Sequence, residues 1–267
     1  MNYRFLFLLL ICFYACDDEI TEPYTISVPP VAMVKVASID YVSRSSPANQ
    51  DVEYTVRYLY EGDQLVEIQN YLNLYNKRYT YNGDQVASRR LFDIAKARDI
   101  GIDSFFYNAY GLLEGVARYY VPETAPPDYQ MKRLFSYHAN GQLAKIEDFE
   151  MPESKLLFTR EYEWDGENLA NMILYYSEPQ VLVDIKEEYE YDQANNYQRL
   201  FVADPDEPVT LNNLTRMNLT DRLGNFDGIY TVENEMTYNA DNLPMQIIRK
   251  QFGVNDGAVD TIRINYQ

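Results

Sequence analysis

The sequence contains few of the residues on which catalytic and metal sites depend. Histidine occurs once in 267 residues, as His138, and cysteine twice, as Cys12 and Cys16. One histidine nearly excludes a Ser-His-Asp triad and a histidine-based zinc site. The sequence also lacks a phosphate-binding glycine loop and the GxSxG and HExxH motifs. It therefore predicts no enzyme, no metal site and no cofactor, with His138 as an exposed turn residue.

Positive charge is scarce as well. Lys and Arg number 23 against 41 Asp and Glu, which gives a net charge of -18. Proteins that bind nucleic acid neutralise phosphates with Lys and Arg, so this balance predicts no nucleic-acid partner. The same charge disfavours contact with anionic lipid headgroups, and any membrane attachment should rest on acyl chains.

Long apolar runs are missing outside the first residues. Residues 5–11 are apolar and follow a short basic start that contains Arg4. This run is too short to span a bilayer as a helix and predicts a signal peptide over residues 1–15. Ala15 before Cys16 resembles the lipobox of bacterial lipoproteins, in which that cysteine is cut free and lipidated. The resemblance implies a lipid anchor at Cys16 and a polar tether over 16–30; the alternative is an ordinary secretory signal cut elsewhere.

Tyrosine is abundant, with 26 residues, and much of it belongs to a recurring unit. In residues 135–146, Phe135 and Tyr137 fall on one face of a strand because side chains alternate. Asn140-Gly141 then supplies the positive φ of a tight reversal, so the unit predicts a β-hairpin. Seven copies can be read: Tyr58 to Ile68, Tyr79 to Arg89, Phe105 to Val116, Phe135 to Ile146, Tyr162 to Met172, Tyr189 to Tyr197 and Met236 to Ile247.

These repeats predict an all-β fold in one domain over residues 31–267. We expect an antiparallel up-and-down meander of 14–16 strands, estimated from the repeat count, that is closed into a barrel or strongly curled. Residues between the paired aromatics are mostly polar, so one face should be aromatic and the other wet. A barrel this wide is not filled by its wall side chains. The sequence breaks the repeat around 198–235, and we expect this insert to plug the sheet if it closes.

A family resemblance follows from the repeats and the N-terminus. The units resemble the YD repeats of secreted shell-forming proteins, and with the lipobox they resemble an uncharacterised family of Bacteroidetes lipoproteins with a porin-like fold. The order Tyr189-Glu190-Tyr191-Asp192, Asn196-Tyr197 and Asn212-Asn213-Leu214 is similar to that family. Asp17-Asp18-Glu19 after Cys16 resembles the surface-export signal of such lipoproteins. The resemblance implies a cell-envelope, outer-membrane lipoprotein exposed at the surface, and no particular activity.

Candidate ligand-binding residues come from two tyrosine pairs, Tyr119-Tyr120 and Tyr175-Tyr176. Adjacent side chains in a strand point to opposite faces, so Tyr120 and Tyr176 are candidates for stacking on a sugar or anchoring a partner; the alternative is packing at a sheet edge. Acidic side chains are expected to be solvated: the loop residues Asp204, Asp206 and Glu207, and most of Glu161, Glu163, Glu187, Glu188 and Glu190.

Three functions remain open. The first is a noncatalytic module that binds a glycan, peptide or envelope partner on its aromatic face or in a barrel mouth. The second is a structural accessory of an outer-membrane complex. The third is a glycoside-active enzyme with two carboxylates, which a buried carboxylate pair in a cleft would favour. A pore is disfavoured because charge interrupts the apolar positions throughout.

Overall fold

The computed structural model describes residues 34–44, 51–71, 74–177, 184–200, 204–221, 230–253 and 257–267. Cys16, the predicted signal peptide and the predicted tether lie outside these residues. Within them, no helix is both long and apolar enough to cross a bilayer.

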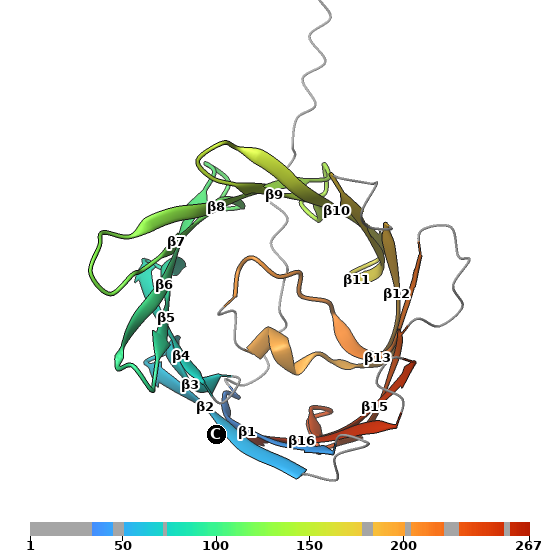
Figure 1. The fold of residues 1–267 in the computed structure, drawn as a ribbon. Coiled ribbons are helices and arrows are strands. Elements are labelled where there is room, and N and C mark those ends of the chain that lie inside the picture. Colours follow the sequence, from blue (N-terminus) through green and yellow to red (C-terminus); the bar gives the residue numbers. More distant parts are fainter. Residues whose placement is uncertain are drawn as a thin grey trace, which may run out of the picture.

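The chain forms a closed barrel of sixteen antiparallel strands (Figure 1). Each strand pairs with its neighbours in sequence, and β1 closes the ring on β16. The strands are β1 (Val36–Arg44), β2 (Asp51–Glu61), β3 (Gln64–Tyr71), β4 (Tyr75–Asn82), β5 (Gln85–Asp93), β6 (Arg98–Tyr107), β7 (Leu113–Tyr120), β8 (Asp128–Tyr137), β9 (Leu143–Glu150), β10 (Lys155–Asp165), β11 (Asn168–Tyr176), β12 (Ile185–Asn195), β13 (Asn212–Asp221), β14 (Tyr230–Tyr238), β15 (Pro244–Gly253) and β16 (Ala258–Tyr266). The predicted all-β meander with a porin-like closure is confirmed.

The tight turns of the repeats gather at one end of the barrel, called here the turn end. Gly83 and Gly141 have φ of 61° and 82°, a conformation that glycine adopts without a steric penalty. His138 is exposed at this end, and its backbone N–H donates to Gln142 at 2.8 Å. The hairpin reading of the repeat and the exposed position of His138 are confirmed.

Every repeat hairpin also carries a β-bulge at the same place. The register shifts between the second aromatic residue and the residue before it in all seven units, for example between Thr80 and Tyr81. A bulge leaves one residue of the partner strand unpaired and turns the following side chains. In the β4–β5 hairpin, Val86 and Arg89 are consequently both buried on the lumen side.

In four repeats, the second aromatic residue donates a hydrogen bond to a backbone carbonyl of the preceding hairpin, as Tyr81 does to Leu65. Tyr107 donates its hydroxyl hydrogen to the carbonyl of Val86 at 3.0 Å, and Tyr137 donates to Leu113 at 2.8 Å. Trp164 makes the equivalent bond to Leu143 at 2.8 Å through its indole N–H. This position is Tyr or Trp in every copy, whereas the first aromatic position also accepts Phe and Met. The reason is that only Tyr and Trp combine a large apolar ring with a hydrogen-bond donor.

The hydrophobic core lines the inside of the barrel. Fully buried side chains such as Ile39, Ile146 and Ile262 alternate with residues that face outward. On β4, Lys77 and Tyr79 are buried, whereas Arg78 and Thr80, which follow them in the strand, are exposed. One face is therefore aromatic and the other largely polar, as predicted.

The outer wall carries charge around much of its circumference. Ion pairs there include Arg90 with Asp99 at 3.2 Å and Lys186 with Glu188 at 2.6 Å. A barrel that crosses a membrane with its strands presents an apolar band to the acyl chains, where Lys and Arg cost about 2–4 kcal/mol each at the midplane. The outer wall of this barrel instead carries ion-paired Lys, Arg, Asp and Glu side chains.

The insert is shorter than the sequence suggests. Strands β13 and β14 occupy 212–221 and 230–238, so within the described part of the predicted 198–235 segment only residues 198–200 and 204–211 lie outside the strands. Residues 198–200 belong to the short helix η1 (Tyr197–Leu200), and residues 204–211, which begin with a turn, lie inside the ring in Figure 1. Residues 204–211 are called the plug below. The prediction failed in length because β13 contains no aromatic repeat signal, although it pairs fully with β12.

Candidate functional site in the barrel lumen

Asparagine side chains hold the base of the plug. Asn196 donates to the carbonyl and hydroxyl oxygens of Thr210 at 3.2 and 3.1 Å. Asn213 is only 2% exposed and donates to the carbonyl of Asn195 at 3.0 Å, and Asn212 donates to Ala194 at 2.9 Å. Buried amides need such partners. The Asn-Tyr and Asn-Asn pattern noted in the sequence therefore has a structural role, which is to close the neck of the insert.

The tip of the plug crosses the lumen and binds the opposite wall. Asp204 accepts hydrogen bonds from Lys77 at 2.7 Å, Arg89 at 2.6 Å and Tyr79 at 3.0 Å. Asp206 is 4% exposed and pairs with Arg89 at 2.9 Å. Burial alone would raise the pKa of Asp204, but Lys77 and Arg89 hold that pKa below its ordinary value.

The predicted solvated acidic loop at 204–207 is therefore wrong for both aspartates. They are ion-paired inside the barrel, with partners 73 to 127 residues away in the sequence. Local sequence contains no sign of partners so distant. The prediction that the insert would plug the closed sheet is confirmed by the same contacts.

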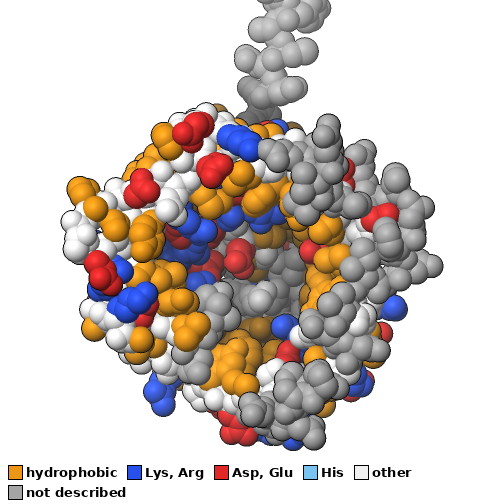
Figure 2. Space-filling model, viewed as in Figure 1, with side chains coloured by type: hydrophobic (Ala, Val, Ile, Leu, Met, Phe, Trp, Pro, Cys, Tyr) orange, Lys and Arg blue, Asp and Glu red, His pale blue; other side chains and the backbone are white. Residues whose placement is uncertain are grey.

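The wall that receives the tip is a basic cluster, made of Lys77, Arg89, Arg118, Arg133 and Arg160. Asp103 and Asp148 lie between these cations: Arg118 pairs with Asp103 at 2.7 Å, and Arg133 and Arg160 each pair with Asp148 at 2.7 Å. Five cations and two wall carboxylates leave an excess of three positive charges. Figure 2 shows Lys and Arg side chains gathered on the inner wall of the hollow centre.

The sequence contains a pattern that indicates this cluster. Lys77, Arg133 and Arg160 each stand two residues before the first aromatic of a repeat. Positions two apart share a face of a strand, so a charge at this spacing must lie on the aromatic, lumen-facing side. The polar layer inside the barrel could have been predicted from that rule.

The plug divides the lumen into three chambers, and Glu207 lines all of them. The aromatic chamber, of about 480 Å³, is lined by β10–β15 and the insert. The apolar chamber, of about 460 Å³, lies at the turn end beside Trp164, Pro205 and Pro208. The basic chamber, of about 570 Å³, lies against the basic cluster. Burial and the charge of Asp204 raise the pKa of Glu207.

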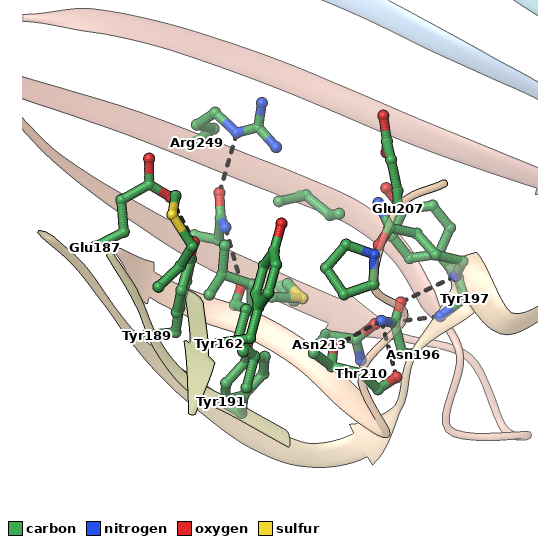
Figure 3. A pocket seen from close by; sticks show the side chains of 18 of the residues that line it. Tyr162, Glu187, Tyr189, Tyr191, Asn196, Tyr197, Glu207, Thr210, Asn213 and Arg249 are labelled. Carbon is green, nitrogen blue, oxygen red and sulfur yellow. Dashed lines mark hydrogen bonds between the residues drawn. The ribbon is translucent and has the colours of Figure 1, made fainter. Parts of the chain in front are cut away.

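The aromatic chamber combines tyrosine rings with hydrogen-bonding groups (Figure 3). Tyr162, Tyr189, Tyr191 and Tyr197 supply the rings. Glu187 accepts a short hydrogen bond from the Tyr189 hydroxyl, and burial raises the pKa of Tyr189. Arg249 donates to Asn234 at 3.3 Å on the far side of the chamber.

Such a chamber can receive a small polar ligand. Ring faces cover its apolar surface, while carboxylate, amide and guanidinium groups fix its orientation. Glu187 is the exception among the glutamates expected on the wet face, because it lines this chamber. Glu161, Glu163, Glu188 and Glu190 are exposed, as predicted.

The structure does not bring the two candidate tyrosines together. Tyr120 lies at the end of β7, is 43% exposed and lines the basic chamber. Tyr176 is half-buried at the end of β11, where it pairs with Phe158 on β10, and it lines none of the three chambers. Tyr119 stacks on Tyr129 with ring centroids 5.1 Å apart. Ligand binding by Tyr120 and Tyr176 stays a prediction.

Metal binding finds no support in the lumen. Among the side chains that the structure describes, no group of three or more His, Cys, Asp and Glu is placed to hold a metal ion. The buried carboxylates described above face Lys and Arg instead.

The closed ring of sixteen antiparallel strands defines a porin-like fold, and solved structures agree. The barrel is similar to a porin-like protein from Bacteroides uniformis ATCC 8492, with a TM-score of 0.55 and 10% identity over 87% of this chain and 98% of that one. A porin-like protein from Bacteroides vulgatus ATCC 8482 gives 0.54 and 10%, over 87% and 99%. At this identity the likeness shows the fold alone. No protein-family model and no curated protein matches the sequence.

Proposed function

We propose that this protein is a noncatalytic cell-envelope lipoprotein that binds a glycan in the aromatic chamber of its barrel. The observation that carries the proposal is the lining of that chamber: four tyrosines together with Glu187, Asn234 and Arg249. Sugar rings have apolar faces that stack on aromatic rings and hydroxyls that need carboxylate or amide partners.

The location rests on separate features. Cys16 and the acidic residues after it support attachment by acyl chains at the outer membrane, exposed at the surface. The charged outer wall supports a tethered domain, because burying these ion pairs in acyl chains would be costly.

Glu187→Gln in the mature chain tests the glycan site. A chamber carboxylate that accepts sugar hydroxyls is worth about 1.5–3 kcal/mol, so this variant should weaken glycan binding by about tenfold or more. Glu188→Gln is the matched control, since it lies next in the strand and is exposed on the outer wall.

The measurement is a glycan-array screen followed by titration calorimetry with the mature chain, carrying Cys16→Ser to keep it unacylated. Equal affinity in wild type and Glu187→Gln would contradict the aromatic chamber as the site. Tyr120→Ala and Tyr176→Ala, measured alongside, test whether either tyrosine contributes.

A glycoside-active enzyme is the second candidate, and one observation favours it. Glu187 and Glu207 line the same chamber, and the pKa of Glu207 is raised, as a general acid requires. Release of reducing ends from a bound glycan, abolished in Glu207→Gln, would establish this function. Intact glycan recovered after prolonged incubation would support the noncatalytic proposal.

A further inference from the structure

The basic cluster takes no part in the pairing of the strands. Sixteen strands close the ring through backbone pairing, whereas the five cations use their side chains to contact Asp103, Asp148 and the plug tip. Charge inside a lumen is expensive unless it is paired. Arg89 and Arg118 share Asp103, and Arg133 and Arg160 share Asp148, so the two wall carboxylates offset two of the five positive charges. At the plug tip, Asp204 pairs with Lys77 and Arg89, and Asp206 pairs with Arg89 and Arg133.

We infer that the basic chamber binds the carboxylate or sulfate groups of an acidic glycan, and that Asp204 and Asp206 occupy this anion site in the ligand-free protein. The inference rests on the proposed glycan function and names the class of glycan. It gives the plug a role as an internal competitor rather than a simple filler.

The contacts of the tip have the form of a bound anion. Both oxygens of Asp204 are engaged, one by Lys77 at 2.7 Å and the other by Arg89 at 2.6 Å and Tyr79 at 3.0 Å. Both oxygens of Asp206 meet Arg89, at 2.9 and 3.2 Å, and one also meets Arg133 at 3.1 Å. Charge-assisted and forked contacts of this kind are how proteins recognise carboxylates and related oxyanions.

The chamber beside the tip has room and free donor capacity. Its volume is about 570 Å³, and Arg118 and Tyr120 line it without touching the tip aspartates. The Nε of Arg160 is buried and has no hydrogen-bond partner in the described part of the chain. Arg160 lines the basic and the aromatic chamber alike. A glycan that stacks on the tyrosines can therefore place an acidic group against this arginine.

The tip can leave without opening the barrel. The neck of the insert is held by Asn196, Asn212 and Asn213, whereas the tip contacts the far wall through side chains. A ligand that binds only after the tip has left shows an affinity reduced by the fraction of molecules in which the site is vacant. Removing the two charges of the tip should therefore tighten binding of acidic ligands and leave neutral ones unaffected.

The test compares trigalacturonate with a neutral galactose trisaccharide and inorganic sulfate, by calorimetry on the mature chain. Asp204→Asn with Asp206→Asn should bind trigalacturonate at least about tenfold more tightly than wild type, with no change for the neutral sugar. Asp63→Asn with Asp241→Asn is the control for net charge, because both of these aspartates are exposed.

Two further readouts do not depend on the double variant. Arg118→Gln in the wild-type background should weaken trigalacturonate binding severalfold, because Arg118 contacts Asp103 but not the plug. Trp164 is the only tryptophan and lines the apolar chamber with Pro205 and Pro208. Its fluorescence should shift when trigalacturonate displaces the tip of the wild-type plug.

Unchanged or weaker trigalacturonate binding in a folded double variant would overturn the inference, as would equal affinity of wild type for the acidic and neutral sugars. If the double variant binds the neutral sugar but binds trigalacturonate no more tightly than wild type does, the inference is wrong and the glycan function stands. If the double variant binds sulfate more tightly than wild type and neither protein binds a sugar, the anion site is supported and the glycan function is wrong.

Discussion

At the residue scale, we expect lumen-facing positions to contribute most to stability and, under the proposed function, to binding. Neighbouring residues on one strand have opposite roles because side chains alternate. Arg89 is buried against Asp103, Asp204 and Asp206, whereas Arg90 beside it is half-exposed on the outer wall. The contribution of an ion pair to the free energy of unfolding therefore differs greatly between adjacent positions of one strand.

Arg89→Met should be strongly destabilising. It leaves buried carboxylates without their shared cation, and breaking a buried pair costs about 3–5 kcal/mol. Arg90→Met, the matched control, should cost less than about 1 kcal/mol because exposed pairs contribute little. Urea unfolding of the two variants measures the difference, and similar midpoints would contradict the burial of Arg89.

The hydrogen bonds that link tyrosines to the preceding hairpin should also make a measurable contribution to stability. Tyr137→Phe removes the hydroxyl that donates to Leu113 at 2.8 Å and should cost about 0.5–1.5 kcal/mol. Tyr110→Phe is the control, since Tyr110 is 60% exposed. If thermal melting shows the same loss in both variants, the hydroxyl does not tie the hairpins together.

At the element scale, the repeat hairpin was predictable and the plug was not. Aromatic residues at i and i+2 with a glycine turn fix a hairpin locally, as in residues 135–146, and this gave the strand number and the aromatic face. The partners of Asp204, in contrast, lie on strands distant in sequence. Tyr120 was predicted as a ligand-binding residue only because it follows another tyrosine. That local pattern carries no information about the chambers that Glu187 and the plug line.

The asparagine neck of the insert makes a further element-scale prediction. Asn213→Ala leaves the carbonyl of Asn195 and the carboxylate of Asp192 without the amide donor they share. An unsatisfied buried group costs about 1–3 kcal/mol, so the variant should be destabilised by that amount. Asn218→Ala on the same strand, which is half-exposed, should cost less; equal losses in urea unfolding would argue against the neck.

At the scale of the whole molecule, the inner tyrosine ring makes the barrel sensitive to alkali. Burial raises the pKa of Tyr107 and Tyr137 from 10.0 to about 12. A raised folded-state pKa means that the protonated form is favoured in the folded state. This contribution to stability is complete below pH 10 and is lost as the pH rises through about 12.

The barrel should therefore unfold more easily in denaturant as the pH rises above 10. Urea midpoints and tyrosinate absorbance, followed over the same pH series, should change together. A midpoint that stays constant while the inner tyrosines ionise would contradict their burial as the cause.

Under the proposed function, the porin-like shape holds a ligand rather than forming a pore. Its charged exterior, tyrosine-lined lumen and ion-paired plug favour a closed container that holds a ligand inside. Hydrogen–deuterium exchange with and without a glycan selected on the array is the most direct test. Protection on glycan binding should appear at residues 187–191, where Glu187, Tyr189 and Tyr191 line the aromatic chamber, and at the plug. Protection confined to segments that line none of the three chambers, such as β2 (Asp51–Glu61), with none at the plug, would contradict binding in the lumen.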